Sequence, residues 1–272
     1  MAAVPAEVLD LRRELERRFP DAQPVRQGTT GAVATGIGPL DGTLPAGGLP
    51  RGRVTLWRPG GGATAVLRSS CEAVVAAGER AAWVDSAGVI SGAYWIRDLG
   101  RFLDTADRGP SRSRVSTGST GATGSSGSSP APLLFRPADP VNAAACAEEL
   151  LRSGGFALVV LTGVGAGGGR ELGDGEGVRL GRAAREGGAA FVTVAGGAPV
   201  SHLKVRTAFD PGGFRWRRGP FGEPAALDSV LIRARLESMG LDRRIRFRLG
   251  VEVHDLRLSL EPRLVDRRGV RR

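Results

Sequence analysis

Three consecutive glycines, Gly60 to Gly62, carry the clearest sign of chemistry in this sequence of 272 residues. They follow a short apolar run that ends at Trp57, and they precede a helix-like run over residues 65–78. A strand, a glycine-rich turn and a helix in this order aim backbone N–H groups at a phosphate. The sequence therefore predicts the outline of a phosphate-binding loop.

The residues that would give this loop its charge are missing. The signature G-x-x-x-x-G-K-[ST] requires a lysine before Thr64, where the chain has Ala63, and a first glycine where it has Arg58. Lysine occurs only at Lys204, so no second lysine near the loop can replace the missing one. The degenerate loop consists of Arg58, Pro59, Gly60, Gly61, Gly62, Ala63 and Thr64. We expect no bound cofactor, no metal and no catalytic residue.

The segments before the loop resemble those that lead into the nucleotide site of RecA. In that family a TG-x-x-x-LD segment and an AGGLP-x-G-R turn precede the phosphate-binding strand. The matching residues here are Thr35, Gly36, Leu40, Asp41, Ala46, Gly47, Gly48, Leu49, Pro50, Gly52 and Arg53. The resemblance implies an α/β fold with a RecA-like core, a doubly wound and mainly parallel sheet flanked by helices.

Following the resemblance, two further catalytic positions are also altered. The residue that would orient the attacking water falls on Ala87, after the strand that ends at Asp85. The residue that would hold magnesium falls on Thr162. Phosphoryl transfer depends on the lysine, the metal ligand and the oriented water together. The degraded site narrows the resemblance to RecA-like accessory proteins of the ImuA type.

This resemblance implies a non-catalytic, cytoplasmic accessory protein in SOS-induced, error-prone translesion DNA synthesis. The implied partners are an inactive Y-family polymerase homologue (ImuB-like) and an error-prone DnaE-type polymerase, with RecA and DNA as further candidates. One alternative is a RecA-like, DNA-dependent ATPase in which Arg58 or Arg68 has taken over the role of the lysine. Another is a cell-division inhibitor of the SulA kind.

Strands expected around the loop alternate with helices, as in a parallel sheet. The expected strands cover residues 54–57, 81–85, 133–135, 156–161 and 189–195, and the expected helices 65–78, 93–103, 139–153 and 178–186. The expected regions are an N-terminal helix and connector (1–34), the core (35–200) with a disordered insertion (107–132), a C-terminal β-rich extension (201–262) and a basic tail (263–272).

The N-terminal helix has one apolar stripe, formed by Val8, Leu11 and Leu15. Such a stripe either packs on the helix's own domain or docks onto a partner, and the sequence leaves both open. Cys71 and Cys146 have no CxxC spacing and no nearby histidine, which predicts two buried thiols in a reducing compartment rather than a disulfide or a zinc site.

Charge and composition favour a polyanion or an acidic protein as a partner. Hydrophobic residues make up 41% and charged residues 24%, as in soluble globular proteins, and no apolar run is long enough to span a membrane. The net charge is +10, of which +8 lies in residues 201–272. The candidate DNA-binding or partner-binding residues are Arg243, Arg244, Arg246, Arg248, Arg267, Arg268, Arg271 and Arg272. A solvated arginine-rich face is the third possibility.

Overall fold

A computed structural model describes residues 31–88, 90, 131–163, 172–197, 201–238 and 240–250, together with residues 7, 10, 11, 13, 14 and 17. Four expected features lie wholly or largely outside these residues. They are Val8 and Leu15, the helix over 93–103, the insertion over 107–132 except its last two residues, and the basic tail with Arg267, Arg268, Arg271 and Arg272.

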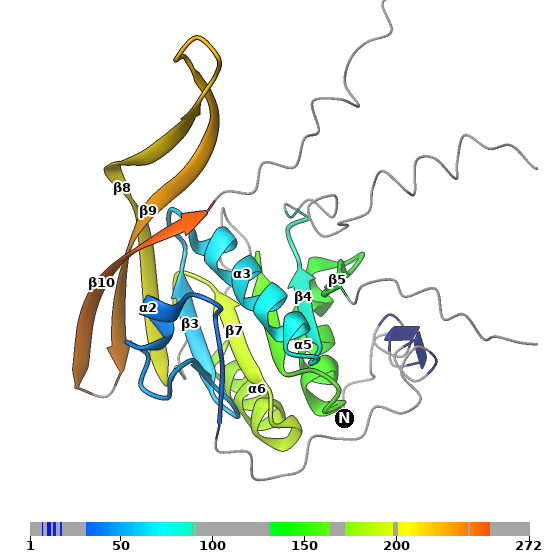
Figure 1. The fold of residues 1–272 in the computed structure, drawn as a ribbon. Coiled ribbons are helices and arrows are strands. Elements are labelled where there is room, and N and C mark those ends of the chain that lie inside the picture. Colours follow the sequence, from blue (N-terminus) through cyan, green and yellow to red (C-terminus); the bar gives the residue numbers. More distant parts are fainter. Residues whose placement is uncertain are drawn as a thin grey trace, which may run out of the picture.

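Besides a two-stranded sheet of β1 (Ala32–Val33) and β2 (Leu49–Pro50), the described residues form an eight-stranded sheet in the order β10-β9-β8-β3-β7-β6-β4-β5. Its strands are β3 (Val54–Arg58), β4 (Ala81–Asp85), β5 (Leu133–Phe135), β6 (Leu158–Thr162), β7 (Ala190–Val194), β8 (Leu203–Arg218), β9 (Pro224–Ser238) and β10 (Leu241–Gly250). All neighbours from β8 to β5 pair in parallel, whereas β8–β9 and β9–β10 pair antiparallel. The C-terminal strands therefore extend the core sheet, and the long β8–β9 hairpin projects beyond it (Figure 1).

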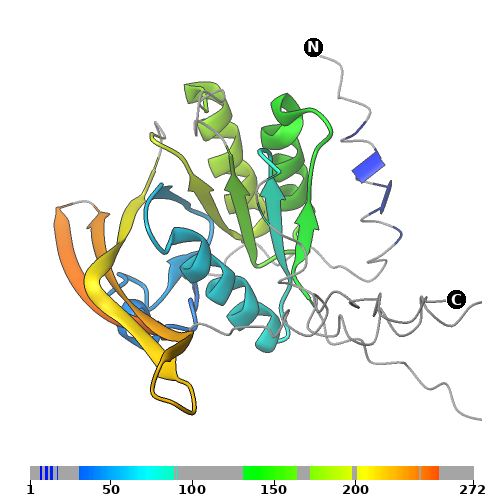
Figure 2. The same ribbon diagram turned by 90° about the horizontal axis from the view of Figure 1, so that it is seen from above.

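Helices cover both faces of the parallel part of the sheet (Figure 2). One face carries α3 (Ala63–Ala76), with α2 (Gly38–Asp41) nearby, and the other carries α5 (Ala143–Arg152) and α6 (Asp174–Gly187). Two separate clusters of buried side chains fill the two layers. Along β6, Leu158 and Val160 belong to the first cluster, and Val159 and Leu161 to the second. This strand is thus buried on both faces, and the predicted α/β fold with a mainly parallel sheet is confirmed.

Hydrogen bonds between its first and last residues hold the TG-x-x-x-LD segment in a defined conformation. The backbone N–H and the hydroxyl of Thr35 both donate hydrogen bonds to one carboxylate oxygen of Asp41, each at 2.8 Å. Leu40, between them in sequence, is fully buried. These bonds fix the chain between β1 (Ala32–Val33) and α2, where the sequence had suggested an irregular connector up to residue 34.

Helix α6 begins one turn earlier than expected. The expected start was Val178, but the helix begins at Asp174, within a glycine-rich segment. The carboxylate of Glu176 accepts a hydrogen bond from the backbone N–H of Gly173 at 3.0 Å, which satisfies one of the unpaired groups at the helix start. Local capping has overridden the low helix propensity of Gly175 and Gly177.

The N-terminal helix contacts its own chain where it is described. Leu11 is buried in the cluster that includes Leu150 of α5. The carboxylate of Glu7 accepts a hydrogen bond from the side-chain amide of Asn142 at 3.0 Å. Between the two interpretations of this helix, these contacts favour packing on its own domain.

Both cysteines are free and buried, as predicted. Burial raises the pKa of the Cys71 thiol far above its usual range and raises the pKa of Cys146 to about 12. Since the thiolate is the reactive form, we expect both thiols of the folded protein to be inert to a disulfide reagent at pH 8. After unfolding in guanidinium chloride, two thiols per chain should react at once. Rapid reaction of one thiol in the native protein would contradict the packing of its helix.

Candidate functional site

The glycine loop has the backbone layout that the sequence predicts. It connects the carboxyl end of β3 to the start of α3, and Gly62 adopts a left-handed conformation with φ of 84°. The N–H of Ala63 donates to the carbonyl of Gly60 at 3.3 Å, and the N–H of Val66 donates to the carbonyl of Gly62 at 3.0 Å. The strand, the turn and the helix of a phosphate-binding loop are therefore all present.

Side chains and backbone of the neighbouring hairpin occupy the space against this loop. A Cβ atom on Gly60 would lie 2.3 Å from the carbonyl oxygen of Thr207, and one on Gly61 would lie 2.6 Å from the ring of Phe209. A Cβ atom on Gly62 would lie 2.8 Å from Ile232. Glycine is needed here because β8 and β9 approach the loop so closely. Close packing, rather than phosphate binding, accounts for the three glycines.

Thr162 at the end of β6 holds two strands together. Its hydroxyl accepts a hydrogen bond from the indole N–H of Trp83 at 2.9 Å and donates to the carbonyl of Val84 at 3.4 Å. The hydroxyl of Ser86 donates to the carbonyl of Thr162 at 2.8 Å. At the position where a magnesium-binding aspartate was considered, the chain thus has a buried link between β4 and β6.

Asp85 is a buried acid at the same edge of the sheet, and it too has partners. One of its carboxylate oxygens accepts from the N–H of Ile90 at 2.7 Å and lies 3.5 Å from the Nε of Arg136. Arg136 also donates to the carbonyl of Ile90. The other oxygen has no hydrogen-bond partner among the described residues. Sequence reasoning did not single out Arg136, because it lies 51 positions after Asp85 and only the β4–β5 pairing brings the two together.

The residues at this edge do not fit a magnesium–nucleotide complex. Ala63 and Ala87 have no group that binds phosphate or accepts a proton, and the hydroxyl of Thr162 is already hydrogen-bonded. Within the described part of the chain, no group of three or more His, Cys, Asp or Glu residues is placed to hold a metal ion. The same part contains no helix that is long and apolar enough to cross a membrane.

Neither arginine near the loop is placed to replace the lysine. Arg68 lies along α3 and donates to the carboxylate of Glu72 at 2.9 Å. Arg58 follows Trp57, whose side chain packs in the same cluster as Val66 of α3. Because side chains alternate along a strand, Arg58 belongs to the sheet face opposite α3.

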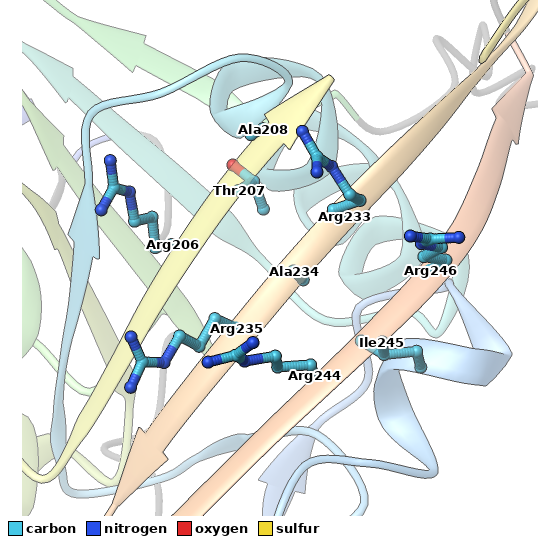
Figure 3. Close-up of a pocket in the computed structure, with 9 residues that line it drawn as sticks. All are labelled: Arg206, Thr207, Ala208, Arg233, Ala234, Arg235, Arg244, Ile245 and Arg246. Carbon is cyan, nitrogen blue, oxygen red and sulfur yellow. The ribbon is translucent and has the colours of Figure 1, made fainter. Parts of the chain in front are cut away.

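The C-terminal strands bring a set of arginines together on that opposite face (Figure 3). They surround a hollow of about 550 Å³ lined by Arg206 of β8, Arg233 and Arg235 of β9, and Arg244 and Arg246 of β10. Of these, the sequence had singled out only Arg244 and Arg246. Alternating arginines on β9 were a usable signal, but only the register between hairpin strands shows that they share a face with β10.

The two other described arginines of the predicted group, Arg248 and Arg243, donate hydrogen bonds to other parts of the chain. Arg248 shares the face of Arg244 and Arg246, and it donates to the carbonyl of Gly213 and the hydroxyl of Ser229, both at 3.3 Å. Arg243 lies on the other face and donates to the carbonyl of Thr43 at 3.2 Å. The run 243–248 therefore divides between two faces, since consecutive strand residues point in opposite directions.

No protein family matches this sequence, and no curated protein resembles it at the sequence level. Among solved structures, the crystal structure of the RadB recombinase is similar, with a TM-score of 0.48 and 17% identity. The matched region covers 80% of this chain and 96% of that one. At these values the likeness carries no argument about function, and the fold class follows from the strand order and the two helical layers.

Proposed function

We propose that this chain is a non-catalytic, RecA-like accessory protein that acts in error-prone translesion DNA synthesis by binding other proteins. The altered glycine loop is the observation that carries the proposal. It has Ala63 in place of a lysine, and Phe209 and Ile232 pack against its glycines. A protein with a RecA-like layout but without the side chains needed for phosphoryl transfer would act through its surfaces rather than through hydrolysis.

The pathway and the partners rest on the resemblance of residues 35–53 to the entry of the RecA core, together with the altered residues Ala63, Ala87 and Thr162, which narrow the resemblance to the ImuA type. The proposed partners are an inactive Y-family polymerase homologue and a DnaE-type error-prone polymerase, with RecA as a further candidate. The proposed setting is the bacterial cytoplasm during the SOS response. In this role the protein would regulate or scaffold a polymerase complex.

We expect the purified protein to release no phosphate from ATP, with or without single-stranded DNA. The chain has no phosphate-binding lysine, no water-orienting acid and no free metal ligand at the three positions described above. A fluorescent ATP analogue should bind no more tightly than about the millimolar range, which corresponds to a few non-specific contacts.

Arg58→Ala is the variant that tests the arginine-based alternative. Phosphate release by the natural sequence that disappears in this variant would contradict the proposal and support an arginine-modified ATPase. Phosphate release that disappears in Arg68→Ala would support the same alternative, although Arg68 is bonded to Glu72 within α3.

Binding to the proposed partners is the direct test of function. The purified protein, the Y-family homologue and the DnaE-type polymerase from the same genome should co-elute as one complex in size-exclusion chromatography. Co-elution with neither polymerase would refute the translesion role, even if the protein proved inert toward ATP.

A further inference from the structure

Arginines on four adjacent strands form one continuous row. Arg58 of β3 is in register with Arg206 of β8, Arg206 with Arg235 of β9, and Arg235 with Arg244 of β10. Two residues further along β9, Arg233 is in register with Arg246 of β10. These six residues, Arg58, Arg206, Arg233, Arg235, Arg244 and Arg246, are the arginine face. All six are exposed, whereas the intervening Ile232, Ala234 and Leu236 are buried toward α2 and α3.

The positive charge of this face is only partly balanced by the protein. Asp210 lies 3.9 Å from Arg233 and 3.7 Å from Arg246. Arg235 pairs with Asp242 at 2.8 Å and with Glu237 at 3.2 Å, and Arg235 lowers the pKa of the Asp242 carboxyl. The guanidinium groups of Arg58 and Arg206 have neither a hydrogen bond nor an ion pair with any described residue. Only three acidic residues thus lie beside the six arginines. The sheet keeps this excess of positive charge even though like charges directly opposite each other in a sheet are destabilising.

The dimensions of the arginine face fit a polymeric anion better than a single small anion. Adjacent strands lie about 4.8 Å apart, so the four-arginine row spans about 14 Å, and the second row lies about 7 Å further along the strands. One guanidinium fork binds one carboxylate or phosphate group. A single phosphate or mononucleotide would leave most of the row unpaired, whereas a chain of regularly spaced anionic groups would engage several arginines at once.

Exposed aromatic rings lie further along the same hairpin. Trp216 on β8 is 55% exposed, and Phe221 in the turn between β8 and β9 is 95% exposed. Arg215 lies on the side of the arginine face, because it is in register with Ser229, which Arg248 contacts. Trp216 follows Arg215 and therefore lies on the other side of the strand, whereas Phe221 lies in the turn at the end of the hairpin. Proteins that bind single-stranded nucleic acid combine a basic track for the backbone with aromatic side chains on which the bases stack. A helix of an acidic protein would need only the charges.

We propose that the arginine face binds the sugar–phosphate backbone of single-stranded nucleic acid and that Phe221, in the turn at the end of the hairpin, stacks on one of its bases. The biological setting of this inference rests on the proposed function, but its physical argument does not involve the glycine loop. Along β8 from Arg206 to Arg217 the face extends for about 30 Å, a length in the range of sites that hold roughly 4–16 nucleotides of a single strand. DNA and RNA share the required chemistry, and the experiment compares them.

Binding is measured by fluorescence anisotropy with labelled dT20, U20, a 20-base-pair duplex and poly-glutamate, using the full-length protein. We expect dT20 to bind more tightly than the duplex and than poly-glutamate, with an affinity that falls as salt rises. Replacing both Arg206 and Arg244 by Gln should weaken dT20 binding at least tenfold at low salt. The log–log salt slope should become shallower by about 1.4, the value for two lost phosphate contacts on a single strand.

Arg243→Gln is the matched control for the single substitution Arg244→Gln, which should by itself weaken dT20 binding. It removes the same charge from the same strand next to Arg244, but on the opposite face, where Arg243 contacts Thr43. Its dT20 affinity should stay within about twofold of the natural protein. Phe221→Ala should weaken dT20 about tenfold and leave the salt slope and duplex binding unchanged, because stacking on bases releases no counterions. Trp216→Ala, on the other side of the strand, should leave the dT20 affinity within about twofold of the natural protein. Equal affinities for dT20 and U20 would identify both single-stranded DNA and single-stranded RNA as ligands. A higher affinity for one of them would identify that nucleic acid as the ligand.

Three outcomes would overturn the inference. Equal losses in Arg243→Gln and in Arg244→Gln would show only diffuse attraction to a basic protein. Poly-glutamate that competes with dT20 on equal terms, with no effect of Phe221→Ala on dT20 binding, would identify an acidic protein as the ligand of this face. Absence of dT20 binding at 50 mM salt would leave the face without a nucleic-acid ligand. ATP turnover would contradict the proposed function but would not change the dT20 binding results. Failure of the proposed function and failure of this inference can therefore be distinguished.

Discussion

Replacing Gly60 by alanine should lower the free energy of unfolding by about 2–3 kcal/mol, because the new methyl group would overlap the β8 backbone. Its Cβ atom would lie 2.3 Å from the carbonyl oxygen of Thr207, and a backbone atom cannot rotate away as a side chain can. Chemical denaturation followed by circular dichroism measures the change. In a loop used for phosphate binding, the same substitution would chiefly affect ligand affinity.

Gly38→Ala is the matched control, since a Cβ atom at Gly38 has nothing within 4 Å. This residue lies in α2, where alanine is the better helix former, so its stability should stay the same or rise slightly. An unchanged midpoint for Gly60→Ala would mean that β8 does not lie against the loop.

A double-mutant cycle between Gly61 and Phe209 tests whether the Phe209 ring packs against the glycine loop. A Cβ atom on Gly61 would lie 2.6 Å from the ring of Phe209 and 3.0 Å from its backbone nitrogen. Gly61→Ala should therefore be destabilising alone and distinctly less so in a Phe209→Ala background. Purely additive effects would show that the ring and the loop are not in contact.

Replacing Thr162 by aspartate should destabilise the fold by about 3–4 kcal/mol, the other large effect that we expect. The position is 7% exposed, and a carboxylate there would be removed from water beside the carbonyl of Val84, from which it could not accept a hydrogen bond. Restoring the acid of an active nucleotide site would thus damage the protein without creating a magnesium site. Thermal unfolding with and without 10 mM magnesium chloride gives both results in one experiment.

Thr162→Val separates the effect of the charge from the loss of the hydroxyl. Valine keeps the shape but leaves the indole N–H of Trp83 without its partner, a change worth about 1–2 kcal/mol. The aspartate variant should be clearly less stable than the valine variant. Magnesium that raised the melting temperature of Thr162→Asp would contradict the structural role given to this residue.

The sequence was sufficient to predict the parallel core because local and global signals agree there. The apolar run over 156–161 is typical of a strand buried on both faces, and the glycines after Trp57 mark a turn into α3. The identification of Ala63, Ala87 and Thr162 as altered positions came instead from the phosphate-binding signature and the resemblance to RecA. Local pattern was less informative at α6, where one carboxylate–backbone bond moved the helix start by a turn.

The contents of the site could not be predicted in the same way, because they depend on contacts between distant residues. Phe209 lies against a loop almost 150 positions earlier, and Arg58 joins a row whose other members lie on three later strands. Such contacts follow from sheet order and register, which a hydrophobic pattern does not specify. For the same reason, the predicted group of basic residues includes both Arg243 and Arg244, although the two side chains lie on opposite faces of the sheet.

The bulge in β8 determines where this protein can change its length during evolution. Phe209 pairs with Ile232 and Phe214 with Val230, so the four residues between Phe209 and Phe214 stand opposite Leu231 alone. An insertion or deletion within this bulge leaves the pairing intact on both sides. One extra residue before Phe209 would instead turn Arg206 toward the core and Phe209 away from the loop, because side chains alternate with a period of two. Natural variants of this protein should therefore differ in length at the bulge and keep a constant length between Leu203 and Phe209.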